Sequence, residues 1–223
     1  TAIVLTDTAM LSPVVDSVES AYPMSLNVGF SLRDTPVANL MRCITRLHAH
    51  SRLNAEGIPV FFREDIRLLA AGSLLQAVEP EGCRKLLAFV ANSRSFALAS
   101  SEINEAVPEL SKLFVHLKDN DFDDIFKYLE EFVAFLTERC VHIDGAFRDR
   151  LYLESLDRSL KRLKSSLSRY NIDVRETTAL YMLERLTLRE TVSLRGKRLE
   201  GVQILGIGDT RALDFNNVAI LTM

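Results

Sequence analysis

Hydrophobic positions follow two different periods along this chain. Near both ends, short apolar runs bounded by Gly, Asp or Asn predict buried strands. These runs occupy residues 2–5, 26–30, 202–207 and 218–223. Three- and four-residue spacing of apolar positions predicts helices over 10–18 and 37–47. The second helix is expected to have Asp34 or Thr35 as its cap and Pro36 at its first position.

The long middle segment has helical spacing throughout. Apolar stripes predict helices over residues 65–78, 80–90, 103–117, 123–139, 146–170 and 175–188. Between Asp65 and Thr191 the sequence shows no strand pattern. Each α/β piece is too short to form a sheet alone. We therefore expect one discontinuous α/β domain, residues 1–56 and 195–223, with a large all-α insertion at 57–194.

A polar crossing from Gly208 to Asn217 joins the last two predicted strands. Such a loop lies at one end of a sheet, where open α/β sheets bind their ligands. The chain stops at Met223, directly after the second of these strands. We therefore expect it to be part of a longer protein.

The segment 202–215, VQILGIGDTRALDF, resembles motif V of UvrD-type superfamily 1 helicases, V-Q-L-M-T-x-H-x-x-K-G-L-E-F. It is closer still to the form found in AddB-type helicase–nuclease subunits, G-L-Q-V-M-G-x-x-E-T-R-x-L-D-F. The positions identical to the helicase form are Val202, Gln203, Leu213 and Phe215. Arg211 stands for its Lys and Asp214 for its Glu. The departures are Gly206 for Thr, Gly208 for His and Ala212 for Gly.

A second resemblance lies near the start of the chain. The run 27–44, NVGFSLRDTPVANLMRCI, is similar to the N-V-T-M-G-Y-P-L-x-x-T-P-V run of AddB-type proteins. Together the two segments imply a RecA-like (P-loop NTPase-like) half-domain, the second of such helicases, interrupted by its helical insertion. Active helicases carry one Arg just after the first strand and another about two turns later. Thr6 and Ser12 occupy these places here, so the resemblance argues against ATP hydrolysis.

The resemblance also implies a DNA-binding loop. Its candidate residues are Gly206, Gly208, Asp209, Thr210, Arg211 and Asp214. Glycines let a backbone approach a ligand closely, and a guanidinium forms a two-pronged contact with phosphate. The alternative is that Arg211 and Asp214 only close the loop by a salt bridge.

The predicted helix over 146–170 is rich in Lys and Arg. Lys161 and Lys164 fall on one outer face, where they could contact duplex phosphates. Acidic neighbours dilute that charge, and a solvated helix face is the alternative interpretation.

Other chemistry receives little support from the sequence. The formal net charge of −3 excludes a protein that is basic as a whole. The three cysteines are far apart and in apolar surroundings, which is typical of free thiols in the cytoplasm. Neither a phosphate loop, G-x-x-x-x-G-K-[ST], nor a nuclease or hydrolase motif is present, so we expect no catalytic residue. His48 and His50 lack the partners of a metal site, and we expect no metal. We see no signal peptide and no membrane span.

The resemblance to AddB-type subunits implies that the chain is part of a bacterial DNA repair and recombination helicase–nuclease that processes double-strand breaks. This part would guide single-stranded or tailed duplex DNA, or dock a second helicase–nuclease subunit, with no cofactor of its own. ATP and Mg would belong to the whole protein, if its first domain has an intact phosphate loop. Two alternatives remain open: part of an active ATP-dependent helicase, or an interaction scaffold without DNA contact.

Overall fold

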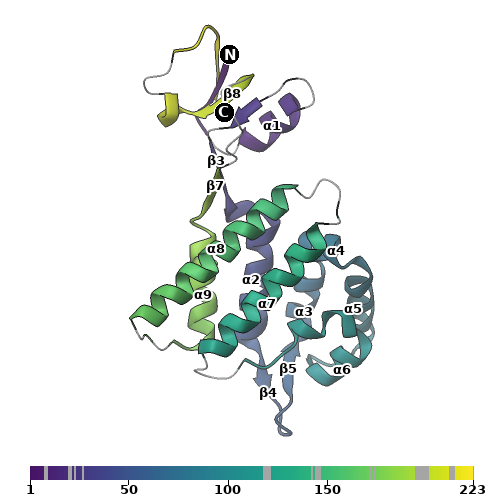
Figure 1. The fold of residues 1–223 in the computed structure, drawn as a ribbon. Helices are drawn as coiled ribbons and strands as arrows, with labels where there is room; N and C mark the ends of the chain where they lie inside the picture. Colours follow the sequence, from purple (N-terminus) through teal and green to yellow (C-terminus); the bar gives the residue numbers. More distant parts are fainter. Residues whose placement is uncertain are drawn as a thin grey trace. The chain divides into compact units, whose positions relative to one another are not determined.

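The computed structural model describes the chain apart from residues 8–9, 20–21, 23, 27, 118–121, 142, 144–146, 171, 173, 194–200, 211–213 and 223. The protein is mixed α/β and includes a parallel sheet, as predicted (Figure 1). It divides into two compact units, residues 1–32 with 190–223, and residues 33–189. We refer to them as the sheet unit and the helical unit.

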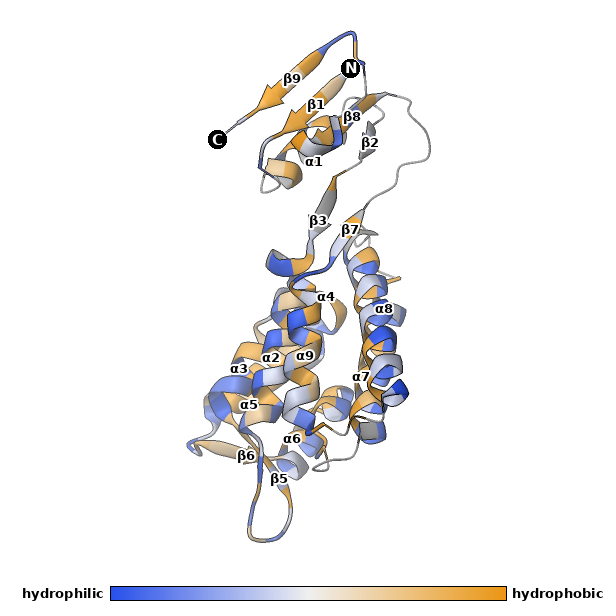
Figure 2. Cartoon of the chain, turned by 90° about the vertical axis from the view of Figure 1, so that its left-hand side faces the viewer, coloured by the Kyte–Doolittle hydropathy of each residue, from blue (hydrophilic) through white to orange (hydrophobic). Residues whose placement is uncertain are grey.

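Four parallel strands form the centre of the sheet unit. They are β1 (Ala2–Leu5), β2 (Met24–Leu26), β8 (Val202–Gly206) and β9 (Val218–Leu221), in the order β2-β8-β1-β9. Ile3 of β1 lies between Ile204 and Ala219 in the register. Figure 2 shows β1 and β9 as mostly hydrophobic, and buried Val4 and Leu205 belong to the core. The predicted strands at 2–5, 202–207 and 218–223 are confirmed in kind.

Helix α1 (Leu11–Glu19) lies on one face of this sheet (Figures 1 and 2). It buries Leu11 and Val15 at helical spacing. The prediction of one strand over 26–30 is wrong, because the chain changes partners within it. Strand β2 pairs parallel to β8, whereas β3 (Gly29–Ser31) pairs antiparallel to β7 (Thr191–Ser193). An apolar run does not specify which strand it pairs with, so the sequence could not separate the two.

The helical unit contains eight described α-helices. They are α2 (Pro36–His50), α3 (Arg63–Ala70), α4 (Ser73–Val78), α5 (Pro80–Asn92), α6 (Ser100–Ala106), α7 (Phe122–Cys140), α8 (Phe147–Arg169) and α9 (Glu176–Thr187). Helix α2 contacts α3, α4, α8 and α9. Its cap is Thr35, whose Oγ1 accepts a hydrogen bond of 3.3 Å from the backbone N–H of Ala38, and Pro36 follows at the first position. The predicted start of this helix is confirmed.

Helix α2 belongs to the helical unit, not to the α/β piece ending at residue 56 to which sequence analysis assigned it. Its buried face is wide, since Thr45 and His48 are buried beside Ile44 and Leu47. That face is covered by the other helices. An amphipathic stripe shows that a helix has a buried face, but it does not show what covers that face.

The expectation that the insertion at 57–194 is all-helical is wrong, because the helical unit also contains a small sheet. Strands β4 (Arg52–Leu53), β5 (Pro59–Phe62) and β6 (Ala97–Ala99) form an antiparallel sheet there. β5 carries the fully buried Phe61, whose ring centroid lies 5.4 Å from that of Phe114. Strand β6 is only three residues long, and its place depends on pairing with β5, a distant segment.

Two predicted helices are each interrupted by a breaker. Pro108 separates α6 from η3 (Pro108–Leu113), because proline lacks the N–H that would continue the ladder and its ring clashes with the preceding turn. Gly72 lies between α3 and α4, and glycine is a poor helix former. The helices predicted over 123–139, 146–170 and 175–188 match α7, α8 and α9 in the described residues.

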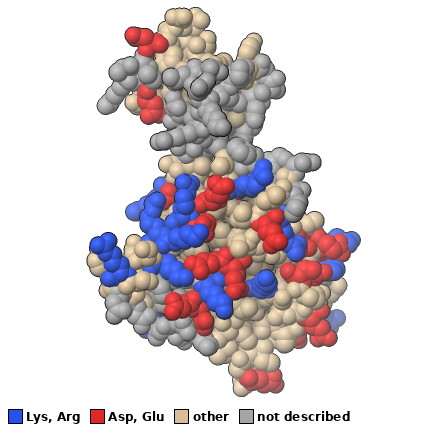
Figure 3. Space-filling model, in the orientation of Figure 1, with Lys and Arg blue, Asp and Glu red and all other residues tan. Residues whose placement is uncertain are grey.

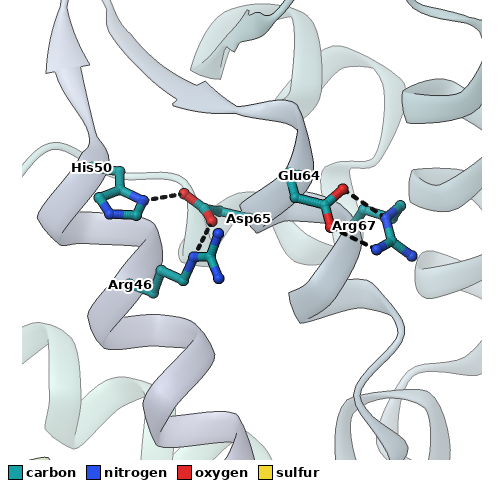
Figure 4. Close-up of polar contacts among 5 residues, drawn as sticks. All are labelled: Arg46, His50, Glu64, Asp65 and Arg67. Carbon is teal, nitrogen blue, oxygen red and sulfur yellow. Dashed lines mark hydrogen bonds and ion pairs between the residues drawn. The ribbon is translucent and has the colours of Figure 1, made fainter.

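A buried carboxylate joins α2 to α3. Asp65 is 2% exposed and lies 2.6 Å from Arg46 Nε and 2.6 Å from His50 Nδ1, both on α2 (Figure 4). Glu64, the residue directly before Asp65, pairs instead with Arg67 of its own helix, in an exposed i,i+3 contact. The Asp65 cluster therefore ties two elements together, whereas the Glu64 pair does not. No described helix is long and apolar enough to cross a membrane.

Candidate functional site

The carboxyl ends of the parallel strands bring the motif V-like residues to one edge of the sheet. Thr6 follows β1 at this edge, and η4 (Ile207–Thr210) follows β8 directly and contacts β1. β8 and β9 flank β1, and Asn217 O accepts a hydrogen bond from the N–H of Ala2 at the opposite edge. The segment after β8 thus crosses from the carboxyl edge to the amino edge. Open α/β sheets bind ligands outside their carboxyl edge, so this is where a site is expected.

Residues 206–210 form a short exposed turn. Thr210 Oγ1 donates a 2.9 Å hydrogen bond to Ile207 O, which closes the turn. The side chain of Ile207 is 63% exposed, and Gly208 and Asp209 are exposed as well. A polymer or nucleotide could therefore reach the backbone here. The described residues leave open space next to Gly208, since a β-carbon at that position would have none of their atoms within 4 Å.

Neither glycine of this turn adopts a positive φ, so backbone conformation does not require a glycine at either place. At Gly206 a β-carbon would approach Asp209 Oδ2 to 3.0 Å, so the exposed Asp209 side chain would have to shift by a few tenths of an ångström. At Gly208 nothing in the described fold demands the absence of a side chain.

Thr6 holds the end of β9. Its backbone N–H and its Oγ1 both donate to Leu221 O, at 3.2 and 3.1 Å. The hydroxyl of Thr6 is thus bound within the sheet. By the resemblance given above, Thr6 stands where active helicases carry an Arg. Arg211 lies outside the described residues, so the Arg211–Asp214 pair considered above does too. Asp214 is described, and its side chain is exposed.

The two lysines predicted to contact phosphates lie on α8 and are both in ion pairs. Lys161 Nζ donates to Asp157 Oδ2 at 2.6 Å, and this hydrogen bond raises the pKa of Lys161. Lys164 Nζ lies 3.0 Å from Glu130 Oε1 on α7. Figure 3 shows Lys and Arg gathered on the α8 and α9 side of the helical unit, with Asp and Glu among them. The carboxylates offset much of the field of these two lysines.

Three residues that stand four apart were not among the predicted site residues: Tyr181 and Arg185 on α9, and Arg189 in the turn that follows it. All three are exposed. Four-residue spacing on a helix places side chains in one row, and this was the signal available. The sequence could not predict that α8 lies beside α9, which makes these side chains one rim of a groove.

No group of three His, Cys, Asp or Glu side chains that could hold a metal ion occurs in the described part of the chain. The chain matches no protein-family model and no curated protein sequence. The likeness to AddB-type subunits therefore rests on the two sequence segments 202–215 and 27–44.

Proposed function

We propose that the chain is the second RecA-like domain, with its helical insertion, of an AddB-type helicase–nuclease subunit that acts in double-strand break repair. In this proposal it guides DNA and has no catalysis of its own. The observation that carries it is the position of the motif V-like segment. Its strand, β8, is an inner strand of an all-parallel sheet, and its polar part begins at the carboxyl edge beside β1.

The contact proposed at this edge is with the DNA backbone. Gly208 is exposed, and no atom of the described residues lies within 4 Å of where its β-carbon would be. Backbone groups bind phosphate without reading the base. Arg211 supplies a guanidinium in the same short segment. Single-stranded and 3′-tailed duplex DNA both present such phosphates, and a second helicase–nuclease subunit is the proposed protein partner.

The proposal includes no ATP turnover by this chain. It lacks a phosphate loop, and the hydroxyl of Thr6 is bound to Leu221 O. ATP and Mg are assigned to the first domain of the whole protein, on condition that its phosphate loop is intact. ATP hydrolysis by this chain above the buffer blank, measured by phosphate release, would overturn this part.

The decisive experiment is fluorescence anisotropy of labelled single-stranded and 3′-tailed DNA, titrated with the chain from low to physiological salt. Arg211→Ala should weaken binding and reduce the slope of log K against log salt by about 0.7, the share of one phosphate contact on a single strand. Arg94→Ala is the matched control, since it removes the same charge from an exposed loop of the helical unit. Equal losses in the two variants would contradict the assignment. Absence of binding at low salt would favour the scaffold function, in which the helical unit docks a partner subunit.

A further inference from the structure

A groove lies between α8 and α9, with a volume of about 530 Å³. Its apolar floor consists of Leu163 on α8 and Met182 and Leu186 on α9. Arg162 stands on the α8 side, and a row of α9 side chains forms the other rim. That volume is within the range of pockets that hold small ligands or parts of larger ones.

The α9 rim carries an aromatic ring followed by two guanidinium groups. Tyr181 and Arg185 are four residues apart on α9, so they lie on one face, about 6 Å apart along the helix axis. Arg189 lies in the turn that follows the helix and also lines the groove. The side chain of Tyr181 is 52% exposed. Neither Arg185 nor Arg189 has a side-chain hydrogen bond or ion pair within the described part of the chain. They differ in this from Lys161 and Lys164, whose charges are paired.

The chemistry of the lining decides between two kinds of occupant. A partner's amphipathic helix would need a broad apolar floor, but Leu163 is 6% exposed and Met182 37%. The groove combines a mostly apolar lining with the ring of Tyr181 and the arginines at its rims, and no acidic side chain is among its described lining residues. Aromatic rings that stack bases, next to cations that follow the backbone, are the means by which proteins hold single strands without sequence preference.

We propose that this groove binds single-stranded nucleic acid, with a base stacked on Tyr181 and neighbouring phosphates held by Arg185 and Arg189. The inference rests on the proposed function for the class of ligand, and it adds a second site in the other unit. Its residues are separate from Gly208 and Arg211, so each site can be tested without the other.

The test uses the absence of tryptophan from the chain. Tyr181→Trp introduces a single tryptophan at an exposed position, and its emission reports stacking. Titration with oligo(dT) at low salt should quench this emission. An abasic strand of equal length and polyglutamate, which carry charge but no base, should not. In the same background, Arg185→Ala with Arg189→Ala should weaken the quenching at least fivefold and lower the salt slope by about 1.4, the share of two phosphates.

The matched control is Arg84→Ala with Arg94→Ala, which removes two exposed charges elsewhere in the helical unit. A second measurement, anisotropy with Tyr181→Ala and Tyr181→Phe, should show weaker binding in the first variant and wild-type binding in the second. Absence of quenching, or equal responses to oligo(dT), the abasic strand and polyglutamate, would overturn the proposal. If Arg211→Ala still weakens binding in that case, the sheet-edge site stands alone. If quenching occurs and Arg211→Ala has no effect, the groove stands and the sheet-edge contact fails.

Discussion

Asp209 packs its carboxylate against Gly206, so that a β-carbon on that glycine would lie 3.0 Å from Asp209 Oδ2. Two residues further along, a β-carbon on Gly208 would have no atom of the described residues within 4 Å. The two glycines of this turn therefore differ in kind. An alanine at position 206 would require the exposed Asp209 side chain to shift by a few tenths of an ångström, whereas an alanine at 208 would displace none of the described residues.

The first prediction uses this difference. Gly208→Ala should leave the free energy of unfolding unchanged or slightly higher, because the new methyl group meets nothing and the unfolded chain loses freedom. The same methyl group should weaken DNA binding several-fold if phosphates approach the backbone there. Urea unfolding and anisotropy on the same preparation check both parts. Unchanged affinity would show that no ligand approaches Gly208.

Much of the local structure could be predicted because its causes are local. The cap at Thr35 and the break at Pro108 each depend on one side chain or ring, although only the cap was predicted. Strands β1, β8 and β9 were found from short apolar runs. The pairing of β3 with β7 and of β6 with β5 could not be found, because it depends on segments distant in the sequence.

The candidate sites follow the same division. The position of Gly206 to Thr210 in the sheet could be predicted because they lie at the end of a strand and directly after it, and η4 lies at the carboxyl edge. The ion pair of Lys164 with Glu130 could not be predicted, since it joins α8 to α7 across 34 residues. For the same reason, the row on α9 became a rim only when α8 was placed beside it.

The second prediction concerns the buried carboxylate between α2 and α3. Asp65→Asn should lower the free energy of unfolding by roughly 1–3 kcal/mol, because Arg46 and His50 lose a buried charged acceptor. Glu64→Gln, in the exposed pair one residue earlier, should change it little, since solvent screens that contact. Chemical denaturation of both variants provides the comparison. Equal losses would show that burial of Asp65 adds nothing to its ion pairs.

The third prediction concerns pH and His48. Burial lowers the pKa of this side chain from 6.5 to about 3, with a smaller contribution from His116. Its Nε2 lies 2.9 Å from Tyr128 Oη inside the core. The unfolded chain binds a proton below pH 6.5 that the folded chain does not bind until about pH 3. Stability is therefore complete above pH 6.5 and is lost as pH falls through that window, by about 2 kcal/mol between pH 7 and pH 5.

Urea unfolding at a series of pH values tests this sign. His48→Phe should reduce the loss of stability between pH 7 and pH 5 by about that amount, whatever constant change the new ring causes. An unchanged pH dependence in His48→Phe would contradict this, because it would show that His48 has the same pKa in the folded and the unfolded chain.

The last prediction separates charge that is available for DNA from charge that is already paired. Lys164 is 34% exposed and Glu130 37%, so their pair contributes at most about 1 kcal/mol and each group remains within reach of solvent. Glu130→Gln should strengthen binding of single-stranded DNA at low salt, because it frees the Lys164 ammonium without adding a contact. Lys164→Ala should weaken binding less than Arg185→Ala, whose guanidinium has no described partner. Anisotropy across a salt series measures all three. If Lys164→Ala proves as harmful as Arg185→Ala, Lys164 must leave Glu130 for phosphate, and α8 would then contact the nucleic acid as directly as the groove.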